Sequence, residues 1–293
     1  MVKIIDCVLF YNEIDMLLFR MKELSHVVDY FIICEATHTF VGNVKSLIFA
    51  DNRDLFAEYK DQIIHVVVDD LPNNGNPWDN EFHQRRAGAR GLELLPTPLD
   101  GEDLILISDV DEIPSSRVLE QIKGGEIVIR DIEILSLTVY YYNFNCRSGV
   151  AWYDLKIVRY DYFNDPRHGA GDMQRLRKLY RIPVSRGRGA AATRSRSMRM
   201  IGVIHNAGWH LSYFGDIEFI RNKILNISHQ ELNKPENLDP ETIRERIKTC
   251  QDLFGRDNNT THKFAWTEID PSNLPKYWTL LRWGTTCPPK PPP

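Results

Sequence analysis

The sequence predicts an α/β fold with a mainly parallel central sheet and helices on both faces of that sheet. In the first 110 residues, short runs rich in Ile and Val alternate with segments whose apolar residues recur at helical spacing. The strand-like runs are apolar along almost their whole length. That is typical of parallel strands that helices cover on both faces.

The elements follow one another in a regular order. The run KIIDCVLF at 3–10 is the first expected strand, and in the NEIDMLLFRMKEL segment after it the apolar residues share one helical face. The pattern continues with a strand at 27–35, a short helix at 54–62, a strand at 63–70, a helix at 79–95 and a strand at 103–110.

The alternation stops after Pro114. The sequence then predicts a helix at 115–123, long aromatic strands at 133–145 and 151–160, a strand-like stretch at 208–215 and helices at 216–232 and 240–254. We expect residues 1–235 to form one domain with added antiparallel strands. Residues 236–293 would be a helical extension packed on the same domain, and the final CPPKPPP a frayed tail.

Composition limits the classes of protein that fit. A chain of 293 residues with 43% hydrophobic residues and a net charge of −4 is typical of a globular protein, with no reason to expect nucleic acid as a partner. No apolar run is long enough to span a membrane, and Asp6 interrupts any signal-peptide pattern. The five cysteines include no C-x-x-C pair, so we expect reduced, mostly buried thiols and a cytoplasmic location.

The segment LILISDVDEIP places three carboxylates directly after a buried strand. In an extended segment Asp109 and Asp111 point to the same side and Glu112 to the other. Ligands of open α/β sheets collect at the carboxyl ends of the strands, and two carboxylates there suit a hard divalent cation that also binds phosphate oxygens.

Helix capping is the main alternative to a metal site for these carboxylates. Asp111 or Ser115 could simply cap the helix near Pro114. An EF-hand is excluded because the Gly and Glu of its loop are missing, and an aspartyl-nucleophile phosphatase would place its D-x-D after the first strand. The position after LILIS favours a metal site.

Several motifs, in order, resemble glycosyltransferase family 17, whose animal members transfer N-acetylglucosamine to glycoproteins. They are FYNEIDMLLFRMKEL, VVDYFIICEATHTFVG, PWDNEFHQRR, ISDVDEIP and AGWHLSYFG, and the similarity covers roughly residues 4–235. The resemblance implies a Rossmann-like GT-A fold, a UDP-sugar donor (typically UDP-GlcNAc), a divalent metal and inversion at the anomeric carbon. The sequence shows no Golgi membrane anchor, which favours a bacterial or viral relative and leaves the glycoprotein acceptor open.

The resemblance also implies roles for individual residues. Asp109 and Asp111 would hold Mn²⁺ or Mg²⁺, with His210 of the GWH motif completing the site unless it is a core histidine beside Trp209. The strand-end residues Asn12, Glu13 and Glu35 would contact the nucleoside, although Glu35 could merely end its strand. Arg85 would meet the diphosphate.

The remaining expectations concern the general base and a basic stretch. Asp172 is the preferred base, although it fits equally well as an N-cap, and Asp216 and Glu218 are the other candidates. Residues 175–199 contain eight Arg, one Lys and no acid, and are expected to form a solvated loop or a lid over the diphosphate. The predicted function is therefore metal-dependent, inverting transfer from a UDP-sugar to a glycan or glycoprotein acceptor. The alternative is a non-catalytic nucleotide-sugar or glycan-binding protein of the same fold.

Overall fold

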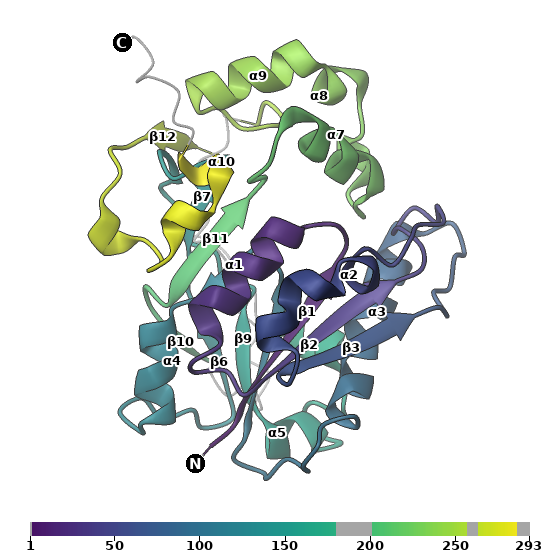
Figure 1. Ribbon diagram of the computed structural model, residues 1–293, viewed down its shortest axis with the longest axis vertical. Helices are drawn as coiled ribbons and strands as arrows, with labels where there is room; N and C mark the ends of the chain where they lie inside the picture. Colours follow the sequence, from purple (N-terminus) through teal and green to yellow (C-terminus); the bar gives the residue numbers. More distant parts are fainter. Residues whose placement is uncertain (1, 180–200, 257–262, 286–293) are drawn as a thin grey trace, which may run out of the picture.

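A seven-stranded, mainly parallel sheet forms the centre of the protein. The computed structural model describes residues 2–179, 201–256 and 263–285. In this sheet the strand order is β10-β6-β9-β4-β1-β2-β3, and only β9 runs against its neighbours (Figure 1). Its strands are β1 (Ile4–Phe10), β2 (Tyr30–Ala36), β3 (Ile63–Val68), β4 (Leu104–Asp109), β6 (Ile132–Leu135), β9 (Lys156–Arg159) and β10 (Gly202–Ile204). The predicted mixed α/β class with a mainly parallel central sheet is confirmed.

Helices cover both faces of this sheet (Figure 1). Strand β1 sends Ile4 and Val8 into the core beneath α1 and α4, and Ile5 and Cys7 into the core beneath α3 and α6. Because the side chains on both faces of each central strand are buried, the sequences of these strands are continuous apolar runs. The helices of residues 2–179 are α1 (Ile14–Leu24), α2 (Ile48–Asp51), η1 (Arg53–Tyr59), α3 (Pro77–Leu92), α4 (Ser116–Lys123), α5 (Tyr160–Asn164) and α6 (Met173–Lys178).

A second, five-stranded sheet lies at the carboxyl end of β4. Its order is β12-β8-β7-β11-β5, and all its neighbours are antiparallel except β7 and β11. The strands are β5 (Glu112–Pro114), β7 (Thr138–Tyr141), β8 (Cys146–Ser148), β11 (Gly208–Ser212) and β12 (Phe264–Trp266). The long strands expected at 133–145 and 151–160 are broken, because the chain leaves the first sheet after β6 and re-enters it only at β9.

The C-terminal helices stand beside the second sheet, above the main sheet in the view of Figure 1. They are α7 (Ile217–Asn226), η2 (Gln230–Leu232), α8 (Pro235–Leu238), α9 (Pro240–Thr249), η4 (Pro271–Asn273), η5 (Trp278–Leu280) and α10 (Arg282–Thr285). The Pro-rich tail lies outside the described residues. Among the helices that the structure does describe, none combines the length and the apolar character that crossing a membrane requires.

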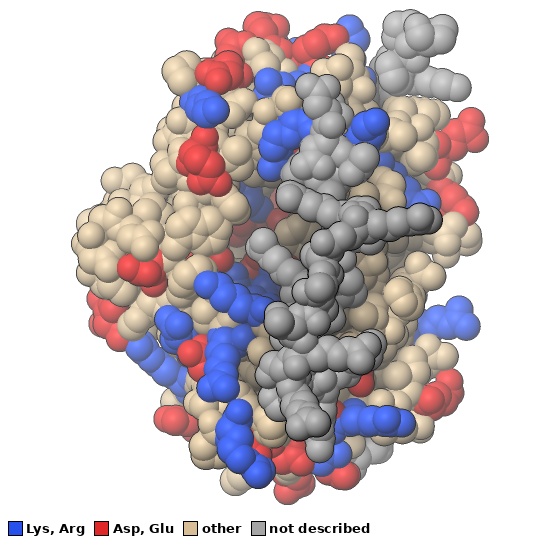
Figure 2. Space-filling model, turned by 180° about the vertical axis from the view of Figure 1, so that it is seen from behind, with Lys and Arg blue, Asp and Glu red and all other residues tan. Residues whose placement is uncertain are grey.

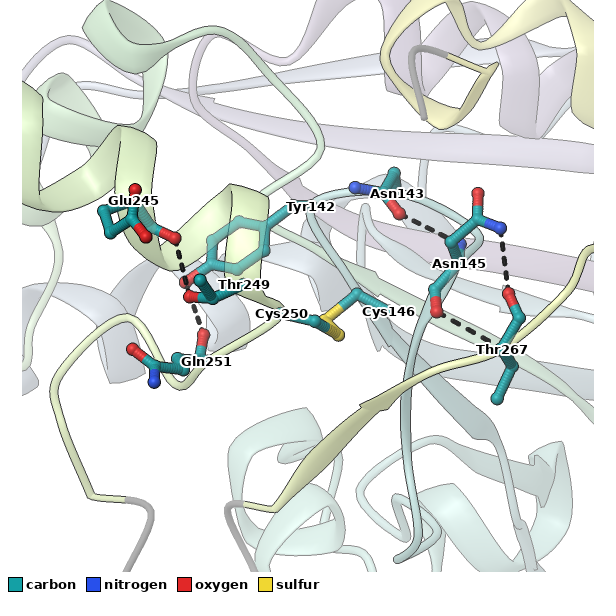
Figure 3. Close-up of a disulfide and its surroundings, with 9 residues drawn as sticks. All are labelled: Tyr142, Asn143, Asn145, Cys146, Glu245, Thr249, Cys250, Gln251 and Thr267. Carbon is teal, nitrogen blue, oxygen red and sulfur yellow. Dashed lines mark hydrogen bonds between the residues drawn. A yellow bond between two sulfur atoms is a disulfide. The ribbon is translucent and has the colours of Figure 1, made fainter. Parts of the chain in front are cut away.

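The cysteines differ from the expectation of reduced thiols. Cys146 of β8 and Cys250, the residue after α9, form a disulfide across 104 residues of sequence (Figure 3). Nearby, the Tyr142 hydroxyl donates a 3.0 Å hydrogen bond to the carbonyl oxygen of Gln251. Cys7 and Cys34 are free and buried, as expected. The pairing could not be read from spacing, because only the fold brings β8 to the end of α9.

Candidate functional site

A cavity of about 800 Å³ opens at the carboxyl ends of β1 and β4. Its wall continues through the segment after β2, helices α3 and α6, strand β11 and helix α7. In an open α/β sheet this is the edge where ligands bind. Seen from behind, the molecule carries basic and acidic side chains interspersed over the surface that is drawn in colour (Figure 2).

The turn that carries the carboxylates is held from beneath by Arg20 of α1. This guanidinium is fully buried and pairs with Asp6 through Nη2–Oδ1 and Nε–Oδ2 distances of 2.6 and 2.7 Å. It also donates to the backbone carbonyl oxygens of Asp109, Val110 and Glu112, the last at 2.6 Å. Because unsatisfied carbonyl groups are costly in the interior, Arg20 fixes the path of the turn between β4 and β5.

Glu112 is not among the residues that line the cavity, and its charge is neutralised inside the protein. Both its carboxylate oxygens lie 2.5 Å from guanidinium nitrogens of Arg177 in α6. The indole nitrogen of Trp152 donates a third hydrogen bond to this carboxylate. A buried charge is tolerated only when it is paired in this way, so Glu112 serves to anchor Arg177 beside the cavity.

Asp109 lines the cavity and pairs with two arginines. Its Oδ1 lies 2.7 Å from Nη1 of Arg85, and its Oδ2 lies 3.0 Å from Nη2 of Arg177. Arg85, which the resemblance places at the diphosphate, thus lies beside this carboxylate in the structure. Both carboxylate oxygens of Asp109 are engaged by cationic donors of the chain itself.

Asp111 lines the same cavity, but its surroundings differ. Lys223 of α7 donates to its Oδ2 at 2.9 Å, whereas its Oδ1 faces Nε2 of His210 at 3.7 Å. Asp111 is in a turn rather than in an extended strand, yet it reaches the same cavity as Asp109. Oδ1 of Asp111 therefore faces the imidazole ring of His210 but lies too far from it for a hydrogen bond.

Gly208 of the GWH motif allows β11 to approach β5 closely. A Cβ at this position would lie 2.1 Å from the carbonyl oxygen of Ile113, so no other residue fits the present backbone. The antiparallel pairing of β11 with β5 then sets His210 opposite Glu112. The glycine therefore serves to bring the histidine to the carboxylate turn.

The charges of Asp111 and Lys223 stabilise each other. Burial alone would raise the pKa of Asp111, but the charges of Lys223 and His210 outweigh burial and hold that pKa below its ordinary value. Burial would likewise lower the pKa of Lys223, but Asp111 and Glu13 raise it well above its ordinary value. Both groups are therefore charged near neutral pH.

The four residues expected to contact the donor occupy different places. Glu13 and Arg85 line the cavity. Asn12 is not among the lining residues, and its amide donates to Asn222 at 3.2 Å. Glu35 is fully buried, and its carboxylate pairs with Lys45 and His65. The structure therefore gives no support to a nucleoside contact by Glu35, which instead holds Lys45 at the cavity.

None of the three expected general bases lines this cavity. Asp172 caps α6 by accepting the backbone N–H of Arg175 at 2.9 Å, and it pairs with the exposed Arg86 at 3.0 Å. Asp216 caps α7, and Glu218 pairs with Arg221 on the exposed face of the same helix. The capping role of Asp172 is thus the one that the structure shows.

The first residues of the basic stretch do not form a solvated loop. Residues 173–178 are α6, and Arg177 is buried in its contact with Glu112. The expectation is wrong for these residues because a buried carboxylate requires a cationic partner. The rest of the expected loop or lid, residues 180–199, lies outside the residues that the structure describes.

Sequence reasoning missed Arg20, Lys223 and an aromatic wall. Arg20 interrupts an apolar helical face, which was a usable signal, whereas nothing near Lys223 in the sequence points to Asp111. The cavity is also lined by Phe40, Trp78, Phe82 and His229, and the ring centroids of Trp78 and His229 lie 4.5 Å apart. The site thus combines a charged floor with apolar ring faces.

The chain is similar in sequence to known glycosyltransferases. The sequence pattern that defines glycosyltransferase family 17 matches residues 1–169. The chain is 29% identical over 118 residues to the β-1,4-mannosyl-glycoprotein 4-β-N-acetylglucosaminyltransferases of Rattus norvegicus and of Homo sapiens. The aligned part is 39% of this chain and 22% of each relative, so it spans about a fifth of their length.

One solved structure gives a weaker match. It is 4-diphosphocytidyl-2C-methyl-D-erythritol synthase from Anaerococcus prevotii, which aligns with 78% of this chain and 99% of its own. The TM-score is 0.42 and the sequence identity 11%, values that do not establish a common fold.

Proposed function

We propose that this chain, which belongs to glycosyltransferase family 17, transfers a sugar from a nucleotide-sugar donor to a glycan hydroxyl. The observation that carries the proposal is the cavity in which Asp111, His210, Arg85 and Lys223 converge at the carboxyl ends of the strands. The arrangement proposed is that of GT-A enzymes, with the donor diphosphate over the carboxylate turn.

The charges of the cavity explain why a cation would accompany the donor. Among the described residues, five Lys and Arg side chains line it, and so do five Asp and Glu side chains. Such a lining offers no excess positive charge to a diphosphate, which carries about two negative charges. A divalent cation bound together with the donor would supply that charge, and Mn²⁺ or Mg²⁺ is the metal that oxygen-rich sites of this kind hold.

Asp111 and His210 fit this cation best. Their facing atoms, Oδ1 and Nε2, lie 3.7 Å apart, close enough for both to bind one ion after a small movement. In the described part of the chain, no group of three or more His, Cys, Asp or Glu side chains is arranged to hold a metal. Two protein ligands are sufficient where phosphate oxygens and water complete the coordination. When bound, the metal would neutralise the charge that develops on the leaving diphosphate.

Asp109 would act through its arginines rather than as a direct ligand. Its two oxygens already accept hydrogen bonds from Arg85 and Arg177. Direct binding to the metal would require one of these guanidinium groups to move. Asp109 therefore orients Arg85 at the diphosphate, where a guanidinium can donate two parallel hydrogen bonds.

The donor and the product are proposed from the names of the relatives. Those names specify a β-linked N-acetylglucosamine added to a β-1,4-mannosyl glycoprotein. The sugar of UDP-GlcNAc is α-linked, so the same product from this chain would require inversion. The aromatic wall of Phe40, Trp78, Phe82 and His229 would receive the nucleobase of this donor.

Calorimetry with UDP-GlcNAc, in the presence of Mn²⁺ and separately of EDTA, tests the proposal. We expect binding with Mn²⁺, much weaker binding with EDTA, and loss of the Mn²⁺ effect in Asp111→Ala and His210→Ala. Asp54→Ala, which removes an exposed carboxylate that does not line the cavity, is the control and should bind normally. Transfer is followed by the mass of a glycopeptide that carries a β1,4-linked mannose.

Two results would change the conclusion. If no member of a panel of nucleotide sugars binds in Mn²⁺, the cavity is not a donor site and the proposal fails. If a donor binds but is neither hydrolysed nor transferred to any glycan in a panel, the chain is a nucleotide-sugar-binding protein that retains the fold without turnover.

A further inference from the structure

Within the described residues, the cavity contains one carboxylate that no cation contacts directly. Glu13, Glu81, Asp109 and Asp111 each lie within 4 Å of a basic side chain. Asp154 also lines the cavity, but across the described part of the chain its carboxylate forms neither a hydrogen bond nor an ion pair. It is half-buried, so it is accessible from the cavity without being fully solvated.

The backbone around Asp154 is held in place from below. Lys156, which is fully buried, donates from Nζ to the carbonyl oxygens of Tyr153 at 2.7 Å and of Asp154 at 3.1 Å. An ammonium group inside a protein requires such partners, and in exchange it fixes the carbonyl groups that it contacts. The segment that carries Asp154 is therefore positioned rather than left as a free loop.

The sheet register places Asp154 close to the carboxylate turn. Strands β4 and β9 are antiparallel, and their last paired residues are Ile107 and Lys156. Two further residues in the same register would set Asp154 opposite Asp109, with both side chains on the same face. The pKa of Arg177 supports this position of Asp154. Burial alone would lower that pKa, but the carboxylates of Glu112, Asp109 and Asp154 together raise it, so Asp154 lies near the same guanidinium as Asp109.

We propose that Asp154 is the general base of the transfer reaction, an inference that rests on the proposed function. Its carboxylate would take the proton of the acceptor hydroxyl as that oxygen forms a bond to the anomeric carbon. The bond from the anomeric carbon to the phosphate oxygen breaks in the same step, and its electron pair leaves with the diphosphate. Asp154 is suited to this role because, among the carboxylates of the cavity, it is the one that no basic side chain of the described residues contacts, so its oxygens are open to an acceptor hydroxyl.

Trp152 gives the acceptor a place beside this base. It lies two residues before Asp154, lines the cavity, and its ring centroid is 4.6 Å from that of His210. Its indole nitrogen is already bound to Glu112, so the ring orientation is fixed. A sugar packed on the exposed part of this ring would bring a hydroxyl toward Asp154, on the side of the cavity next to the proposed metal ligand.

Asp154→Asn is the direct test, because it keeps the size of the side chain and removes its basicity. UDP-GlcNAc binding in Mn²⁺ should stay within about twofold of the unaltered protein, whereas transfer to the β1,4-mannosyl glycopeptide should fall by about 10²- to 10⁴-fold. Asp154→Ala with added sodium formate supplies a small external base and should regain part of the lost rate. Asp172→Asn and Asp216→Asn are matched controls and should keep transfer within a few-fold.

The outcomes separate this inference from the function on which it rests. If the unaltered protein transfers sugar and Asp154→Asn does so within tenfold, the base assignment is wrong and the function stands. If the unaltered protein binds and transfers no nucleotide sugar, both are wrong. If Asp154→Asn loses donor affinity in parallel with transfer and formate restores nothing, Asp154 supports the structure of the site and is not the base.

Discussion

Arg177 and Glu112 form a paired contact inside the protein in which two guanidinium nitrogens each lie 2.5 Å from a carboxylate oxygen. Arg177 also reaches Asp109 at 3.0 Å, so one guanidinium links an inward-facing and a cavity-facing carboxylate. This contact joins α6 to the turn between β4 and β5. The stability of the protein and the geometry of the site therefore depend on the same side chain.

Arg177→Met should be strongly destabilising, because it leaves the charge of Glu112 buried without its partner. Breaking a buried ion pair costs about 3–5 kcal/mol in the free energy of unfolding, measured by urea denaturation. Glu112→Gln combined with Arg177→Met should recover part of the loss, since the uncompensated charge is gone. Arg175→Met, on the exposed side of the same helix, is the control. If Arg177→Met and Arg175→Met lower the free energy of unfolding equally, the buried pair contributes no more to stability than an exposed arginine does.

The sequence predicted the elements whose periodicity is strong. β1 to β4, α1 and α3 lie close to their expected positions because an unbroken apolar run and a helical apolar face are local signals. The region after Pro114 was harder. Residues 133–145 are rich in apolar and aromatic side chains on both sides of Ser136, so nothing local shows that the chain leaves one sheet at Leu135 and enters another at Thr138.

Several residues that the sequence singled out lie together in the structure, while their roles stay predictions. Asp109, Asp111, Arg85, Glu13 and His210 do meet in one cavity. The carboxylates were expected to need a bound cation, but the chain itself supplies Arg20, Arg85, Arg177 and Lys223 to the turn. These partners are distant in sequence, so no spacing rule pairs them with the carboxylates.

Glu35 should contribute to stability above about pH 4 and lose that contribution in acid. Burial would raise the pKa of Glu35, but hydrogen bonds from His65 and the backbone of Phe49, with the charge of Lys45, hold that pKa below its ordinary value. The unfolded state, with an ordinary Glu pKa of about 4.3, binds more protons than the folded state in this range. Stability therefore falls as the pH drops through the unfolded and then the folded pKa.

Glu35→Gln tests this dependence. Melting temperatures between about pH 3 and pH 6 should fall less steeply with acid in this variant than in the unaltered protein, although its stability at neutral pH should be lower. Glu93→Gln removes an exposed carboxylate and should keep the original slope. An unchanged slope in Glu35→Gln would contradict the shifted pKa.

The Cys146–Cys250 disulfide should stabilise the fold by closing a long loop. Replacing both cysteines by alanine should lower the free energy of unfolding by about 2–5 kcal/mol, because the unfolded chain regains the freedom that the bond removes. Reductant should destabilise the unaltered protein and leave the double variant unaffected. Peptide mapping after alkylation without reductant checks the bond directly, and modified Cys146 or Cys250 would disprove it.

Trp78→Ala should weaken donor binding if the aromatic wall receives the nucleobase. Stacking of a base on an aromatic side chain is worth about 1–3 kcal/mol, so calorimetry should show a dissociation constant for UDP-GlcNAc raised by about 5- to 140-fold. The loss should be equal for UDP alone and absent for GlcNAc 1-phosphate, which has no base. Trp283→Ala is the matched control, because Trp283 lines a separate pocket beside Asp216 and Ile247. A loss seen with GlcNAc 1-phosphate but not with UDP would place the sugar, not the base, against Trp78.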